Sequence, residues 1–187
     1  MKFFKKNSYE IVRLFVIQIG ITIFSLVVTT AAQTAFDGER ALLAKLVVSL
    51  FSIAFYLFII YSTAWEFGSK HQKEDADKYY GLKCITVASL PNIFLGILMC
   101  IGLLRLAYPE SIFAGLYAIP HLIAGLLESM HLGFLQYVKP TGENAQFVFS
   151  AIYYLLSSVP AILVTHVAYT LGRKNIRLTK GTPPSRE

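Results

Sequence analysis

Four long apolar runs alternate with short polar segments along the chain. They cover residues 11–32, 46–67, 84–104 and 147–171, and charged residues lie only near their ends. About 20 residues of helix cross a hydrocarbon core of about 30 Å. Only a helix satisfies its own backbone hydrogen bonds in such a core. The pattern therefore predicts an all-α protein, a single membrane domain built as an integral membrane four-helix bundle.

Polar and small residues recur inside these runs at steps of three and four, which places them on one face of each helix. We call them the polar stripes. They are Gln18, Thr22, Ser25 and Thr29; Lys45, Ser49, Ser52, Tyr56 and Thr63; Ser89, Asn92 and Gly96; and Ser150, Tyr154, Ser157, Ala161, Thr165, Ala168 and Gly172. Small and hydroxyl residues allow membrane helices to approach closely. The stripes are expected to be packing surfaces, with a polar path along the bundle axis as the alternative.

A fifth apolar stretch, about residues 111–137, is interrupted by Pro120 and carries Glu128. If the stretch spanned the membrane, Glu128 would lie near its middle, at a cost of roughly 2.5–3.5 kcal/mol. We therefore predict an amphipathic segment on the outer face between the third and fourth spans. It is either interfacial or re-entrant with a break at Pro120, and a fifth span is the alternative.

The basic residues decide between these topologies. With four spans, 13 of the 17 Lys and Arg residues fall on one side of the membrane; with five, the split is 9 against 8. Cytoplasmic loops carry the excess of Lys and Arg. The sequence thus favours four spans, both termini in the cytoplasm and a basic cytoplasmic tail, residues 173–187, in a multi-pass protein of the cell (inner) membrane.

Composition supports this class of protein. The chain of 187 residues is 55% hydrophobic and 15% charged, with a mean hydropathy of +0.56, whereas soluble domains carry about 25% charge. The net charge of +6 does not indicate a nucleic-acid partner, because the basic residues flank the apolar runs. Cys84 and Cys100 share one apolar run and fit neither a disulfide framework nor a metal motif.

The stretch IPHLIAGLLESMH, residues 119–131, holds the most distinctive candidate chemistry. Glu128 and His131 form an E-x-x-H pair, a spacing that di-metal helical bundles use. His121 lies seven residues before Glu128, about 10.5 Å of helix rise, too far to share one ion with ligands about 2.1 Å from it. We therefore predict no metal and no cofactor. His121, Glu128, His131 and also His166, in the fourth run, remain candidates for ligand binding or proton transfer.

A second candidate lies at the inner end of the second run, in YSTAWEFGSK. Trp65 belongs to an interfacial aromatic belt, and Glu66 and Lys70 form an i, i+4 pair. These three residues are either a membrane anchor or a cytoplasmic docking surface for a partner.

Two short motifs carry a resemblance. Y-x-x-x-W-x-x-G-x-K, from Tyr61 to Lys70, and A-Y-x-L-G-R-K, from Ala168 to Lys174, resemble a group of uncharacterised small multi-span membrane proteins of Gram-positive bacteria. In that group an acidic residue is expected after the first motif, where this chain has His71. The resemblance implies a bacterial inner-membrane protein and transfers no catalytic residue.

From these features we expect a non-enzymatic membrane subunit or accessory protein. It would act through helix packing and its cytoplasmic loop, in the lipid bilayer, as a homo-oligomer or in a larger membrane complex. A small transporter or channel with the polar stripes lining a path is the first alternative. A membrane metal protein or enzyme using His121, Glu128 and His131 is the second.

Overall fold

A computed structural model describes residues 7–72, 79–108 and 112–176. In these ranges the regular elements are all helical, which confirms the all-α prediction. They are α2 (Ser8–Ala35), α3 (Gly38–Lys70), α4 (Tyr80–Ala88), α5 (Leu90–Gly102), the 3-10 helix η1 (Leu103–Leu106), α6 (Phe113–Leu127), the 3-10 helix η2 (Ser129–His131), α7 (Leu132–Val138), α8 (Glu143–Leu156) and α9 (Ser158–Arg173). Of the predicted basic tail, residues 177–187 lie outside the described ranges.

The apolar segments are of two kinds, those without a sharp bend and those with one. In the described residues α2, α3 and the α8–α9 pair are each long and apolar enough to cross a membrane. The α4–α5–η1 segment passes the same test but bends by 57°, and the α6–η2–α7 segment bends by 87°. The described chain thus offers three candidate spans without a sharp bend, or up to five when each bent pair is one span.

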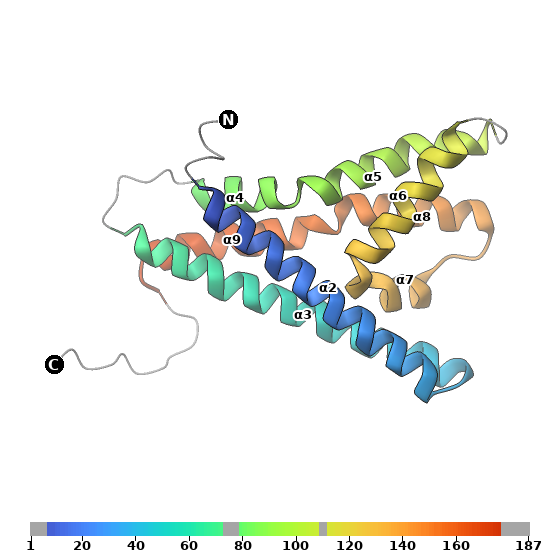
Figure 1. The fold of residues 1–187 in the computed structure, drawn as a ribbon, viewed down its shortest axis with the longest axis horizontal. Coiled ribbons are helices and arrows are strands. Elements are labelled where there is room, and N and C mark those ends of the chain that lie inside the picture. Colours follow the sequence, from blue (N-terminus) through green and yellow to red (C-terminus); the bar gives the residue numbers. More distant parts are fainter. Residues whose placement is uncertain (1–6, 73–78, 109–111, 177–187) are drawn as a thin grey trace.

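The helices have a common direction, which gives the molecule two distinct ends (Figure 1). The start of α2, the end of α3, the start of α4 and the end of α9 gather at what we call the terminal end. The α2–α3, α5–α6 and α7–α8 connections lie at the opposite end, the loop end. Helix α6 runs from the loop end toward the middle of the molecule, where η2 and α7 follow it after a bend of 87°. We call residues 113–138 the hairpin.

The polar stripes lie in the interior between the helices, and large apolar side chains lie on the outer surface. Val16, Val27 and Phe58, for example, are exposed. The buried stripe residues are Gln18, Thr22, Ser25 and Thr29 of α2; Ser49, Ser52, Tyr56 and Thr63 of α3; Ser89, Asn92 and Gly96; and Tyr154, Ala161, Thr165, Ala168 and Gly172 of α8 and α9. Their burial between helices confirms the prediction that the stripes are packing surfaces.

Glycine brings α3 and α9 into backbone contact near the terminal end. A Cβ atom on Gly172 would overlap the carbonyl oxygen of Trp65, and one on Gly68 would overlap that of Tyr169. Both helices therefore depend on the missing side chain at this crossing, as close helix pairs in membranes commonly do.

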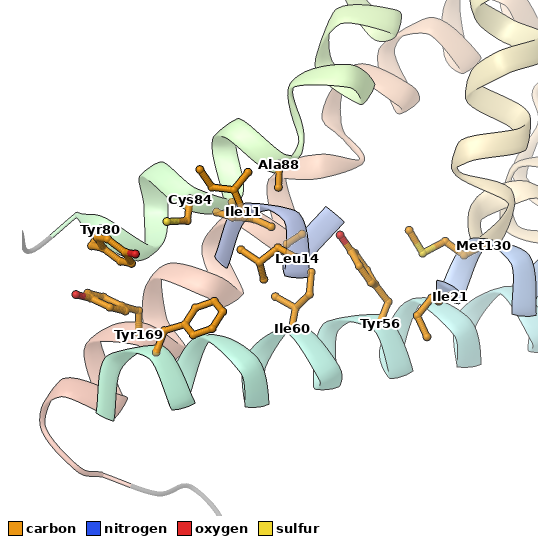
Figure 2. Close-up of a cluster of buried hydrophobic side chains, with 13 residues drawn as sticks. Ile11, Leu14, Ile21, Tyr56, Ile60, Tyr80, Cys84, Ala88, Met130 and Tyr169 are labelled. Atoms are coloured by element: carbon orange, nitrogen blue, oxygen red, sulfur yellow. The ribbon is translucent and has the colours of Figure 1, made fainter. Parts of the chain in front are cut away.

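Two apolar clusters lie on either side of the molecular centre. The first extends from Tyr80 and Tyr169 at the terminal end to Tyr56 and Met130, with Leu14 and Ile60 between them (Figure 2). The second belongs to the α5, α6, α7 and α8 helices. Its buried members are Leu95, Met99, Tyr117, Ala124, Leu135, Ala151 and Tyr154.

The helix breaks differ from the predicted ones. Pro120 was expected to break the 111–137 segment, but α6 continues through it and ends at Leu127, because a helix tolerates proline when neighbouring helices support the freed backbone. The third and fourth runs, expected to be continuous, are interrupted at Ser89 and Ser157. Proline shortly after each interruption removes a backbone donor.

Candidate functional site

The turn between α6 and α7 is held by hydroxyl groups of the polar stripes. Thr22 Oγ1 donates a hydrogen bond to the Leu127 carbonyl at 2.7 Å, and Ser49 Oγ donates to the Met130 carbonyl at 2.5 Å. Ser129 Oγ donates in return to the Thr22 carbonyl at 2.6 Å. A helix end leaves carbonyl groups without intrahelical partners, and α2 and α3 supply the missing donors.

Glu128 lies inside this turn and is buried, with 2% of its surface exposed. Its Oε2 atom has no hydrogen-bond partner among the described residues. The nearest cationic candidate is His131, whose Nε2 lies 4.0 Å from Oε2, beyond hydrogen-bond distance. The Ser157 hydroxyl is a hydrogen-bond partner of the same carboxylate, but one neutral donor does not offset the large desolvation cost of a buried ionised carboxylate. Glu128 therefore requires a proton or another cation for neutralisation.

This burial corrects one of two alternatives. We expected Glu128 either to face the outer interface or to pair with His131; the structure buries both residues and places His131 Nε2 4.0 Å from the carboxylate. The reason is the 87° bend, which directs the residues of the turn toward α2 and α3.

His131 faces two groups at once. Its Nδ1 atom lies 2.8 Å from the Tyr153 hydroxyl, and its Nε2 faces Glu128. When the phenol donates to Nδ1, a neutral imidazole carries its proton on Nε2. The Tyr153 hydroxyl can thereby set which ring nitrogen presents a proton toward the carboxylate.

A small cavity of about 10 Å³ adjoins Glu128, enough for about one water molecule or one ion. Side chains of α2, α3, α5, η2 and α9 contribute to its wall. The lining residues are Gln18, Tyr56, Asn92, Glu128, Met130, His131, Ser157, Ser158 and Ala161. Ser158, itself 6% exposed, has an Oγ atom without a hydrogen-bond partner among the described residues.

Residues at or near all three helix breaks reach this cavity. Asn92 follows the α4–α5 break at Ser89, Glu128 is the break between α6 and η2, and Ser157 separates α8 from α9. Discontinuous helices that meet near the middle of a bundle are typical of substrate and ion sites in transporters.

Sequence reasoning missed this convergence, although a local signal exists. The motif S-x-P-x-I occurs twice, at residues 89–93 and 158–162. Ser and Pro together are a common cause of an interrupted apolar helix. The paired motifs would have indicated two matching breaks in the third and fourth runs.

The other candidate histidines lie away from the cavity. His121 stacks on Tyr117 with ring centroids 5.4 Å apart, and His166 stacks on Tyr79 at 6.0 Å. Neither lines the cavity. The described residues contain no group of three or more His, Cys, Asp or Glu side chains able to hold a metal.

The three candidate docking residues have partners within the chain. Glu66 accepts hydrogen bonds from Arg13 at 2.9 Å and from Lys70 at 2.6 Å. Trp65 Nε1 donates to the Ile176 carbonyl at 2.8 Å. These contacts join the end of α3 to α2 and to the segment after α9, so the residues have a structural role at the terminal end.

Comparison with protein families, with curated proteins and with solved structures finds no match to this chain.

Proposed function

We propose that the chain is a multi-pass membrane protein with four spans, a re-entrant hairpin at residues 113–138 and both termini in the cytoplasm. The apolar exterior and polar interior support a lipid environment, since a soluble protein rarely exposes large contiguous apolar patches. The 87° bend supports the re-entrant hairpin. Arg13, Lys70, Lys83 and Arg173 lie near the terminal end, which supports a cytoplasmic location for that end.

We further propose that the protein is a small transporter in which Glu128 carries the coupling ion. The observation that carries this proposal is a buried carboxylate oxygen without a hydrogen-bond partner, at a point where three broken helices meet. An ionisable residue within a membrane region costs free energy and usually has a function. A purely structural bundle would be more stable with an apolar residue there.

In the proposed transporter, the two apolar clusters block access to this site from either side. Leu14 and Ile60 lie between the Tyr80–Tyr169 pair at the terminal end and Tyr56, which lines the cavity (Figure 2). Met99 and Tyr117 belong to the second cluster. In the proposed mechanism this conformation corresponds to an occluded state, and transport requires one cluster at a time to open.

A non-enzymatic subunit is the second candidate, and the small size of the cavity favours it. The cavity beside Glu128 has only about 10 Å³, and most residues of the polar stripes are buried in helix contacts. In that case the protein acts by assembling with a partner or with copies of itself.

Thiol accessibility separates these two functions. In a chain with Cys84 and Cys100 replaced by alanine, a cysteine in place of Ala161, beside the cavity, should react with a small membrane-impermeant thiol reagent from at least one side of the membrane. Ala64→Cys is the matched control and should stay unreactive, because Ala64 is fully buried on α3 and belongs neither to the two apolar clusters nor to the cavity wall. Equal inertness at both positions over the same period would contradict transport and favour the subunit.

A further inference from the structure

We propose that the cavity beside Glu128 binds a single monovalent cation of the sodium class. This inference rests on the proposed transport function and specifies its coupling ion. It begins from two orphaned oxygens, Glu128 Oε2 and Ser158 Oγ, which belong to different helical segments and line the same cavity.

The wall of the cavity supplies the ligand chemistry that a hard cation needs. Such cations prefer carboxylate, carbonyl and hydroxyl oxygens. The oxygen-bearing side chains are the carboxylate of Glu128, the amides of Gln18 and Asn92, and the hydroxyls of Tyr56, Ser157 and Ser158. His131 is the only nitrogen base that the described part of the chain contributes to this wall, and one imidazole does not make a transition-metal site.

Charge selects a monovalent ion. Among the described residues, Glu128 is the only acidic one in the wall, and no Lys or Arg side chain lines it. One bound monovalent cation makes the ionised site neutral, whereas a divalent cation would leave a net positive charge in a medium that strongly disfavours it. Helix α6 ends at Leu127, and the partial negative charge of a helix C-terminus also favours a cation.

Size and helix geometry agree with this assignment. A cavity of about 10 Å³ admits one water-sized body, so a dehydrated small ion fits while an organic solute does not. In transporters with broken helices, the unwound segments and half-helix ends coordinate such ions. Here the ligand residues Asn92, Glu128 and Ser158 each lie at or near a helix break.

The test is sodium-dependent stability of the purified full chain in detergent. The thermal unfolding midpoint is measured while NaCl replaces choline chloride at constant ionic strength and pH. The midpoint should rise and continue to rise with the logarithm of sodium concentration, as expected for a ligand that binds only the folded state. Equilibrium binding of radioactive sodium should saturate near one ion per chain.

Three variants assign the effect to the cavity. Glu128→Gln keeps the shape but removes the charge, and should abolish the sodium dependence. Ser158→Ala should weaken the apparent sodium affinity about tenfold, the result of losing about 1.4 kcal/mol of binding energy. Glu143→Gln, an exposed acid at the start of α8, should leave the sodium response unchanged.

Two outcomes would overturn the assignment, and they affect the transport proposal differently. If sodium has no effect but the midpoint depends on pH and this dependence disappears in Glu128→Gln, the site holds a proton, facing His131, Tyr56, Tyr153 and Tyr154. The transport proposal then stands on the Ala161→Cys result. If sodium and pH both leave the midpoint unchanged and Ala161→Cys is inert, the ion site and the transport proposal both fail.

Discussion

Individual hydroxyl groups determine where the 113–138 hairpin turns. Thr22 and Ser49 each donate to a carbonyl group of the turn from a position 105 and 81 residues away in the chain, respectively. A carbonyl buried without a donor costs about 1–3 kcal/mol. The two side chains therefore contribute to stability by satisfying groups that the helix break has released.

We expect Ser49→Ala to destabilise the protein by about 1–2 kcal/mol, because the Met130 carbonyl loses its donor in a buried site. The midpoint of thermal unfolding in detergent should fall accordingly. Ser62→Ala is the matched control: Ser62 also donates to a carbonyl, but it lies on the exposed face of α3 and bonds within its own helix, so its effect should remain within about 0.5 kcal/mol. Similar losses for both variants would show that the hairpin does not depend on this contact.

The polar stripes were predictable from the sequence, but the burial of Glu128 was not. The stripes follow a helical period, which any helix of the chain must respect. By contrast, α6 ends at Leu127 although the strongest local signal for a break is Pro120. The end is decided by Thr22, Ser49 and Ser129 through contacts distant in sequence, and local pattern carries no information about such partners.

At the scale of elements, α3 and α9 cross in close backbone contact. Gly68 and Gly172 lie opposite each other, and the Cβ position of Gly172 is 3.1 Å from the Gly68 Cα atom. The second resemblance motif contains Gly172, and the first contains Gly68. The structure thus gives both motifs a physical role in bringing two helices together.

Gly172→Ala should therefore separate α3 from α9 and destabilise the protein by about 1–3 kcal/mol, the range for overpacking a close contact. Gly20→Ala provides the control in another long helix, because its Cβ would have no atom within 4 Å. It should be neutral or stabilise by up to about 1 kcal/mol, since alanine is the better helix former. Unfolding midpoints of the two variants make the comparison, and a harmless Gly172→Ala would contradict the close crossing.

The lengths of the apolar runs predicted the positions of the long helices but not the breaks within them. The runs at 11–32 and 46–67 correspond to α2 and α3, which extend a few residues further at each end. The runs at 84–104 and 147–171 contain breaks at Ser89 and Ser157. Hydropathy does not detect such breaks, because the residues on both sides of each break are equally apolar.

For the whole molecule, the four-span arrangement predicts that the terminal end and the loop end lie on opposite sides of the membrane. With four spans and a re-entrant hairpin, a cysteine at the exposed position Asn175 should label only from the cytoplasm. A cysteine at Asp37, in the short exposed connection between α2 and α3, should label only from outside. Intact cells and inverted vesicles, in the background without Cys84 and Cys100, provide the two measurements. Labelling of both positions from the same side would contradict the four-span arrangement.

The hydrogen bonds of the hairpin also have a consequence for synthesis. Translation runs from the N-terminus, so Thr22 and Ser49 are made well before the carbonyl groups of Leu127 and Met130 that accept from them. Helices α2 and α3, joined by only two residues, form the receiving surface first. A nascent chain that has reached residue 138 already contains both hydroxyl donors for its hairpin, and the turn can dock before α8 and α9 have left the ribosome.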